Sequence, residues 1–157
     1  MEELEAPGRL THILISLDTS KLSEAVLPIA AQLAKHLDLD VILAMSVPTA
    51  SDLYVGPAIL IHRIDILKKL ELEAAEYLKE TSEKLSRDQG LRVTWKVLGG
   101  DPGTAIVDYA KDNLQNNMIA TSTHSGSGIG RWLIGSVTDK VVRSSGDPVL
   151  VVRPSSA

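Results

Sequence analysis

The chain has 157 residues, of which 44% are hydrophobic and 23% are charged, and its formal net charge is −4. This length and composition predict a single globular domain with its own hydrophobic core. The acidic balance argues against nucleic acid or an anionic membrane as the main partner, because both select for basic surfaces. The absence of cysteine excludes disulfides, thiolate metal ligands and thiol nucleophiles.

No stretch of the sequence predicts insertion into a membrane or export. The longest apolar runs are far shorter than the ~20 residues that span a bilayer. The first residues are acidic, whereas a signal peptide begins with a basic segment followed by an apolar one. We therefore expect a cytoplasmic protein with a flexible N-terminal arm at residues 1–9, a single domain at residues 10–154 and a tail at residues 155–157.

Hydrophobic periodicity alternates between the patterns of strands and helices along the chain. In chain order we predict a strand at 10–17, a helix at 22–37, a strand at 41–47, a helix at 59–88, a strand at 91–98, a helix at 104–113, a strand at 118–121, a helix at 137–144 and a strand at 149–152. Strands that alternate with helices pair in parallel through right-handed crossovers. The pattern therefore predicts an open α/β sheet with helices on both faces.

Several residues have the chemistry of helix starts. Ser20 or Ser23 is suited to cap the first helix, and Pro28 lies close enough to its beginning to kink it rather than end it. Ser136 and Asp139 have the spacing of a capping box at the start of the last helix.

The stretch 122–136 has the composition of a phosphate-binding loop. It follows an apolar strand, is rich in glycine and serine, and leads into a helix. Glycines let backbone N–H groups approach an anion, and a helix N-terminus adds a partial positive charge. Ligands of open α/β sheets bind beyond the carboxyl ends of the strands, where the direction of winding reverses. Residues 18–20 and 122–136 are therefore candidate binding loops, although a glycine-rich loop is about as often a plain turn.

No arrangement of residues predicts catalysis or a metal site. His124 and Ser125 are adjacent, so their side chains diverge, and no Gly-x-Ser-x-Gly motif surrounds Ser125. The other histidines are scattered without the spacing of metal ligands. We assign no catalytic residue and no metal ligand.

Taken together, four motifs resemble the universal stress protein family over nearly the whole chain. They are Ile-Leu-Ile-x-Leu-Asp-x-Ser ending at Ser20, Val-Ile-Leu-Ala-Met-x-Val-Pro ending at Pro48, Gly100-Asp-Pro, and the run 123–143 followed by Asp-Pro-Val-Leu-Val-Val-Arg. The resemblance implies a Rossmann-like, five-stranded parallel sheet of order 3-2-1-4-5. It also implies a stress-linked cytoplasmic protein, frequent dimerisation and, in one branch of the family, bound ATP, which Mg²⁺ would accompany.

The ATP-binding branch carries Gly, two residues, Gly, nine residues, and then Gly followed by Ser or Thr. Counting back from Gly135-Ser136 places Ser122 and Ser125 where the first two glycines belong, so the spacing is kept and both glycines are replaced. Two non-glycine residues forced to positive φ would cost ~2–4 kcal/mol. One hydrogen bond to a charged oxygen contributes ~1.5–3 kcal/mol. We therefore expect weakened rather than abolished nucleotide binding, with the serine hydroxyls able to donate to phosphate.

The resemblance assigns the other contacts residue by residue. Asp18 matches the acidic residue that meets the adenosine end of the ligand, or else it is a turn aspartate. Val41 matches a strand position whose backbone meets adenine, and Gly135 matches a glycine of close approach. Ser136 matches a hydroxyl that contacts phosphate, or else it only caps the helix. The predicted nucleotide-binding set is Asp18, Val41, Ser122, Ser125, Gly126, Gly128, Gly135 and Ser136.

The last strand and the loop together suggest what the protein does. Residues 149–153 form an apolar edge strand that invites pairing with a second copy, as the resemblance also implies. A nucleotide-responsive dimer that acts on protein partners is favoured, because the loop length and the downstream Gly-Ser survive. A stress-linked dimer without nucleotide is the alternative, and a slow ATP hydrolase comes last because the sequence shows no positioned base.

Overall fold

The computed structural model describes residues 8–52, 56–123 and 135–154. Its strands are β1 (His12–Ser16), β2 (Asp40–Val47), β3 (Val93–Gly99), β4 (Asn117–Ser122) and β5 (Val149–Val152). Its helices are α1 (Lys21–Glu24), α2 (Leu27–Leu37), α3 (Pro57–Gln89), α4 (Pro102–Asn113) and α5 (Ser136–Ser144), with a short 3₁₀ helix, η1 (Ala50–Asp52). The predicted arm at 1–9 and tail at 155–157 lie almost wholly outside the described residues.

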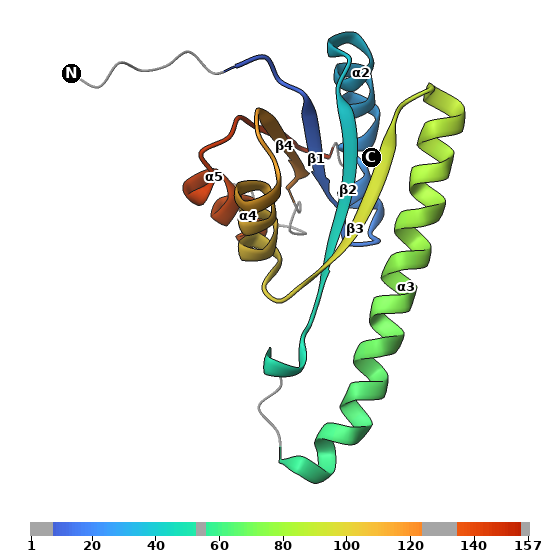
Figure 1. The fold of residues 1–157 in the computed structure, drawn as a ribbon, viewed down its shortest axis with the longest axis vertical. Coiled ribbons are helices and arrows are strands. Elements are labelled where there is room, and N and C mark those ends of the chain that lie inside the picture. The colour runs from blue at the N-terminus through green and yellow to red at the C-terminus, as the bar shows by residue number, and fades with distance from the viewer. Residues whose placement is uncertain (1–7, 53–55, 124–134, 155–157) are drawn as a thin grey trace, which may run out of the picture.

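The strands form one parallel sheet in the order β3-β2-β1-β4-β5, which confirms the predicted fold class and strand order (Figure 1). Helices α2 and α3 cover one face, and α4 and α5 cover the other. After β1 the chain adds β2 and β3 on one side of that strand, and it then adds β4 and β5 on the opposite side. The direction of winding therefore reverses between β1 and β4.

Strand β1 is buried on both faces. Ile13 and Ile15 pack into the core beneath α2 and α3, while Leu14 packs into the core beneath α4 and α5. All three side chains are at most 1% exposed. Burial of one such side chain contributes about 1.5–3 kcal/mol, so the carboxyl end of β1 is held firmly from both sides.

Residues 22–37 form two helices, so the single kinked helix predicted there was wrong. Helix α1 ends at Glu24, where the N–H of Ala25 donates to the carbonyl of Leu22 (3.2 Å), and Pro28 lies in the first turn of α2. Proline lacks an N–H, and its ring clashes with the carbonyl four residues earlier. A break just before Pro28 removes the clash and places the missing N–H where no helical bond is needed.

The predicted capping residue was correct for α1 and wrong for α5. Ser20 caps α1, and its Oγ accepts from the N–H of Ser23 (3.0 Å). The capping box predicted at α5 does not form. Gly135 is the N-cap, Ser136 is the first helical residue, and the Asp139 carboxylate accepts from Arg143 Nε (2.8 Å). Glycine at the N-cap moves the helix start one residue earlier than expected.

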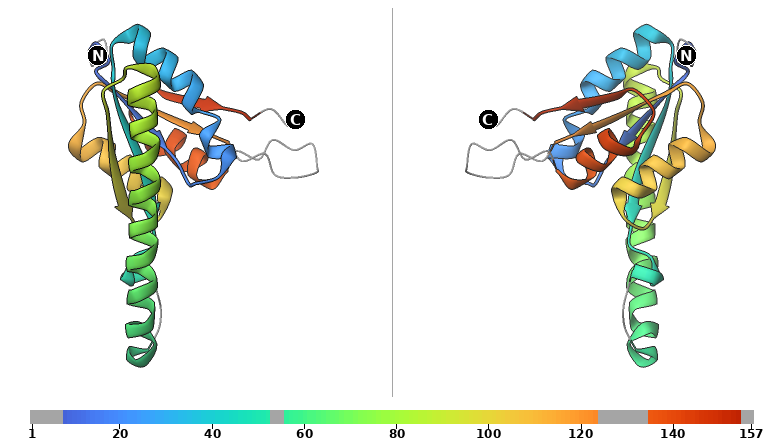
Figure 2. Two further views of the ribbon diagram at one scale, coloured as in Figure 1. Left: turned by 90° about the vertical axis from the view of Figure 1, so that its right-hand side faces the viewer. Right: turned by 90° about the vertical axis from the view of Figure 1, so that its left-hand side faces the viewer.

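Helix α3 is much longer than the strands it covers. Ala74 and Leu78 are fully buried against the sheet, and Gly90 ends the helix in the left-handed conformation, with φ of +64°. The N-terminal part of α3 extends beyond the carboxyl ends of the strands (Figures 1 and 2). Within the described ranges, no helix is both long enough and apolar enough to cross a membrane.

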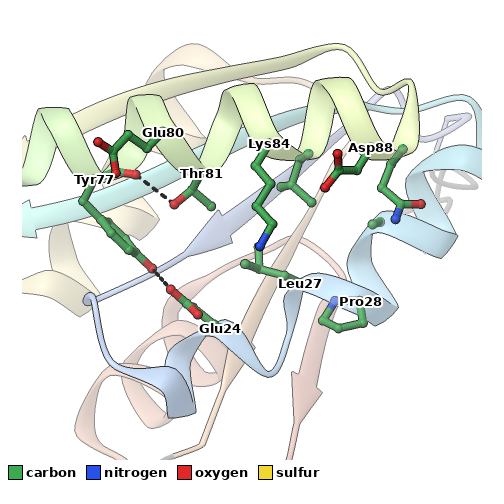
Figure 3. Close-up of a pocket in the computed structure, with 11 residues that line it drawn as sticks. Glu24, Leu27, Pro28, Tyr77, Glu80, Thr81, Lys84 and Asp88 are labelled. Carbon is green, nitrogen blue, oxygen red and sulfur yellow. Dashed lines mark hydrogen bonds between the residues drawn. The ribbon is translucent and has the colours of Figure 1, made fainter.

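A groove of about 540 Å³ separates α2 from α3 (Figure 3). One hydrogen bond spans it, from the Tyr77 hydroxyl on α3 to Glu24 Oε1 on α1 (2.8 Å). Burial of the phenol, and next the bond to the Glu24 carboxylate, raise the pKa of Tyr77 well above its ordinary value. The neutral phenol is therefore the form that holds α1 to α3.

We expect Tyr77→Phe to lower the free energy of unfolding by about 1 kcal/mol near neutral pH, because a hydrogen bond to a charged acceptor is lost. Since the pKa of Tyr77 is higher in the folded than in the unfolded chain, its contribution is complete below about pH 10 and is lost as the pH rises above that value. Urea unfolding should show a smaller difference in the free energy of unfolding between Tyr77→Phe and wild type at pH 11 than at pH 8.

Tyr109→Phe is the matched control, since the Tyr109 hydroxyl has no hydrogen-bond partner among the described residues. Equal effects of the two substitutions at pH 8 would contradict the role given to the Tyr77 bond.

Candidate functional site

A small cavity lies at the carboxyl edge of the sheet, at the point where the winding reverses. Its volume is about 110 Å³, and its walls are the ends of β1, β2 and β4, the loop after β1, and the first residues of α4 and α5. Ligand pockets for whole drug-sized molecules are typically about 300–1,000 Å³. The part bounded by described residues therefore suits one portion of a ligand, such as a sugar or a phosphate. The larger groove between α2 and α3 lies away from this edge.

Asp18 lies in the cavity wall directly after β1, as the sequence predicted. Its Oδ1 accepts from the N–H of Ser20 (2.9 Å), and its own N–H donates to Ser23 Oγ (3.2 Å). Asp18 is thus also a turn aspartate, so the two interpretations of this residue do not exclude each other. A carboxylate has about four lone-pair positions, and the bond to the Ser20 N–H uses one of them.

The residue after Asp18 has an unusual backbone conformation. Thr19 has φ of +70°, the left-handed region that β-branched residues rarely adopt. Such a conformation costs about 1–3 kcal/mol and is concentrated at functional sites. The strained turn at Thr19 directly follows Asp18 in the cavity wall, and no signal in the sequence predicted it.

Ser122 is the last residue of β4 and lines the cavity, as predicted, but its backbone is not strained. It pairs with Val152 in the sheet and is absent from the described non-glycine residues with positive φ. The backbone penalty expected at this position was therefore wrong. Its hydroxyl donates to the carbonyl of Leu22 (2.6 Å) and lies 3.3 Å from the carbonyl of Ser23. Because a hydroxyl carries a single hydrogen, this serine ties β4 to α1 instead of offering that proton to a ligand.

Among the described residues, the N-terminus of α5 has no side-chain cap, in contrast to those of α1 and α4. Ser20 caps α1, and Asp101 caps α4 by accepting from the N–H (3.0 Å) and the hydroxyl (2.8 Å) of Thr104. The backbone bond, followed by the hydroxyl bond, lowers the pKa of Asp101. At α5 the N-cap is Gly135, and no side chain among the described residues accepts from its first turn. Backbone N–H groups at a helix start without a side-chain cap are suited to bind an anion.

A close contact places the starts of α4 and α5 side by side. A Cβ atom at Gly103 would lie 2.7 Å from the Cβ of Lys140, so only glycine allows α4 to approach α5 this closely. The sequence suggested only a turn around Gly103. Pro102, which directly precedes Gly103, and Val137, which lies three residues before Lys140, both line the cavity.

The polar residues of the cavity wall that escaped sequence reasoning include Ser46, Thr121 and Thr138. Ser46 donates to the carbonyl of Gly100 (2.7 Å), and Thr138 Oγ1 lies 3.4 Å from the carbonyl of Ser122. A hydroxyl residue at or near the carboxyl end of each central strand was a signal that could have identified two of them.

The structure does not bring every predicted site residue to the cavity. Val41 is the second residue of β2, pairs with Ile13 and Val93, and is buried at the amino end of the sheet, on the opposite edge from the cavity. Ser136 is exposed at the start of α5, next to Gly135 in the cavity wall. The predicted contacts Ser125, Gly126 and Gly128 lie outside the described residues.

The charge of the cavity wall is simple. Asp18 is the only ionisable side chain among its described lining residues. No group of three His, Cys, Asp or Glu side chains in the described segments could hold a metal ion. The chemistry of the described wall is therefore one carboxylate, several hydroxyls and the backbone N–H groups at the start of one helix.

Comparison with known proteins gives relatives along nearly the whole chain. Residues 10–153 match the universal stress protein family. A universal stress protein of Methanocaldococcus jannaschii is 30% identical over 141 residues, which cover 90% of this chain and 81% of that protein.

Solved structures agree with the observed fold. The universal stress protein UspA from Lactobacillus plantarum has a TM-score of 0.76 at 22% identity, covering 93% of this chain and 99% of that one. The universal stress protein from Archaeoglobus fulgidus in complex with dAMP has a TM-score of 0.63 at 22% identity, covering 92% and 98%. Two others are complexes with cAMP and AMP, with TM-scores of 0.64 and 0.62 at 21% and 14% identity; they cover 94% and 93% of this chain and 100% and 93% of their own. From the match over residues 10–153, together with the shared fold, we conclude that this chain belongs to the universal stress protein family.

Proposed function

We propose that this chain is a regulatory protein that binds ATP or a related adenine nucleotide at the carboxyl edge of the sheet, between β1 and β4. The observation that carries the proposal is the uncapped N-terminus of α5, which shares one cavity with Asp18 at the point where the winding reverses. Structures of family members with cAMP, dAMP and AMP support the same class of ligand.

The described residues fit the two ends of such a ligand. The N–H groups at the start of α5 would donate to a phosphate, and Gly135 lets the phosphate approach the backbone closely. The Asp18 carboxylate would accept from a ribose hydroxyl or the adenine amino group, as a charge-assisted hydrogen bond. Mg²⁺, if it accompanies ATP, would be held mainly by the phosphates, because the described wall provides a single carboxylate.

The site supports binding better than catalysis. Hydrolysis of ATP needs a group that positions or deprotonates water near the terminal phosphate. Asp18, the only ionisable side chain of the described wall, is assigned to the adenosine end. We therefore propose that the nucleotide acts as a signal rather than a substrate.

The last strand connects this site to a proposed dimer interface. Among the described residues, β5 pairs with β4 alone, so its outer edge has no partner strand there, and Val151 on this strand is 39% exposed. We propose that two copies pair along residues 149–153 to form a cytoplasmic homodimer. The N–H of Thr123 donates to the carbonyl of Val152 (3.0 Å), so a ligand on the loop 122–136 would act next to the dimer edge. Through that edge, nucleotide binding would change which protein partners the dimer meets.

Substitution of Gly135 by valine tests the phosphate end of the site. We expect Gly135→Val to weaken nucleotide binding about tenfold or more, the loss of one hydrogen bond to a charged oxygen. Calorimetric titration of the nucleotide-free protein with AMP and with Mg-ATP measures this. Gly56→Val is the matched control, because Gly56 is also an uncapped N-cap with extended backbone, in open space at the start of α3.

Folded protein that releases no heat with either nucleotide at millimolar concentration would overturn nucleotide binding. It would favour the alternative, a stress-protein dimer that acts through protein partners alone.

Two serine-to-alanine variants separate anchoring from ligand contact. We expect Ser122→Ala to lower the free energy of unfolding by about 1 kcal/mol, since its bond to Leu22 is lost, and to leave nucleotide affinity unchanged. Ser136→Ala should lower nucleotide affinity and leave the free energy of unfolding unchanged, because the exposed Ser136 side chain has no bond to any described residue. Thermal unfolding and calorimetric titration of both variants check this, and weakened binding by Ser122→Ala with unchanged stability would contradict it.

The dimer edge is tested by a charge on β5. We expect Val151→Lys to convert the dimer to monomer in sedimentation velocity at micromolar protein, because a lysine on an edge strand opposes pairing with another chain. Val142→Lys on α5 introduces the same charge at a similarly exposed valine and should leave the dimer intact. A wild-type protein that sediments as a monomer would refute this interface.

A further inference from the structure

The N-terminal part of α3 carries apolar side chains in an exposed position. Ile59 and Ile66 are 53% and 54% exposed, and Leu70 is 36% exposed. This part of the helix extends beyond the carboxyl ends of the strands, with η1 beside it (Figures 1 and 2). Exposed apolar side chains rimmed by polar residues are typical of protein–protein interaction sites. An extended helix with an apolar side therefore calls for a partner.

The exposed side chains follow the spacing of a helix–helix interface. Positions 59, 63, 66, 70, 73 and 77 are separated alternately by four and three residues, the a/d pattern of a coiled coil. We call this set the α3 stripe: Ile59, Arg63, Ile66, Leu70, Glu73 and Tyr77. Its length is about 27 Å at 1.5 Å per residue.

We propose that the partner is a second copy of this chain, packed antiparallel along the α3 stripe around a two-fold axis near Lys68. This alignment places Ile59 opposite Tyr77 of the second copy and Ile66 opposite its Leu70. It also places Arg63 opposite Glu73 of the second copy. Every position of the α3 stripe thereby meets a complementary one, and the symmetry repeats each contact.

Charge selects the antiparallel direction. Residues 59–70 contain three basic side chains and one acidic side chain, whereas residues 71–83 contain five glutamates and one lysine. An antiparallel pair sets the basic segment of one copy against the acidic segment of the other. A parallel pair in register would set Arg63 against Arg63 and Glu73 against Glu73, and like charges at such positions oppose association.

The contacts within one chain leave this surface available. Glu73 Oε1 is 3.8 Å from Lys69 Nζ, and both side chains are exposed. Exposed pairs of this kind contribute little, so the Glu73 carboxylate is free to turn towards a second copy. Tyr77, at the far end of the α3 stripe, lines the groove between α2 and α3 (Figure 3), so the second copy's Ile59 would meet the open side of that groove.

This surface is independent of the nucleotide site and of the proposed β5 interface. α3 packs beside β3, whereas β5 forms the opposite edge of the sheet. Two isologous interfaces on one chain give assemblies larger than a dimer. The α3 pairing is therefore tested at its own residues, whether or not nucleotide binding and the β5 dimer hold.

Disulfide trapping locates the interface, since the chain has no cysteine of its own. Ile66→Cys and Leu70→Cys proteins are mixed at equal micromolar concentrations, left to exchange subunits and oxidised mildly. We expect the mixed disulfide to form in excess over either homodisulfide, as mass spectrometry would show. Leu72→Cys is the control, because Leu72 is 71% exposed on the same helix but outside the α3 stripe. It should cross-link only at the background rate.

A charge exchange tests the alignment. We expect Arg63→Glu and Glu73→Arg each to weaken the α3 association roughly tenfold in sedimentation equilibrium, and the double variant to restore it. The two positions are about 15 Å apart along one helix, so a rescue requires contact between chains. Circular dichroism confirms that each variant is folded.

Either of two results would overturn the proposal. One is a mixed disulfide no more abundant than the Leu72→Cys product, and the other is a double variant as weakly associated as the single ones.

Discussion

The structure depends on the double burial of β1. Its alternating side chains fill two separate cores, so neither face of the strand can turn towards solvent without emptying one of them. Each aliphatic side chain withdrawn from water contributes about 1.5–3 kcal/mol. β1 is also the strand where the winding reverses, and the backbone that leaves its carboxyl end is the loop that carries Asp18. Core packing of β1 therefore positions the loop that carries Asp18 and the strained Thr19.

Beyond the carboxyl end of β1, the site is defined by backbone N–H groups at a helix start for which the described residues provide no side-chain cap. Every helix start has N–H groups without intrahelical partners. α1 and α4 satisfy theirs with Ser20 and Asp101, both on the chain itself. α5 starts with a glycine, which has no side-chain acceptor, and Gly103 allows α4 to pack closely beside it. An anion at the start of α5 would accept hydrogen bonds from the first N–H groups of this helix, which have no side-chain cap among the described residues.

Sequence patterns predicted the sheet well because its strands are short and separated by periodic helices, and the three central strands are buried. Strand order followed from the family resemblance, and Asp18, Ser122 and Gly135 were correctly placed at one edge because parallel strands all end there. The break before Pro28 and the N-cap at Gly135 were missed because helix ends depend on which side chains reach which backbone groups. Val41 was placed at the wrong end of β2 for a contact with the cavity, since burial makes all residues of such a strand look alike. The close approach at Gly103 depends on Lys140, which is distant in sequence, and no local pattern encodes it.

Ser122 shows how a replaced glycine can keep a site in a changed form. Glycine is needed where φ is positive or where no Cβ fits, and neither condition holds at the end of β4, where Ser122 pairs regularly with Val152. The serine instead uses its hydroxyl to hold α1, and through α1 the Tyr77–Glu24 bond reaches the long helix α3. The cavity, the dimer edge at β5 and α3 are thereby joined through one polar residue. A glycine at position 122 has no hydroxyl to donate to the Leu22 carbonyl, so the serine holds α1 at the carboxyl edge of the sheet where glycine would not.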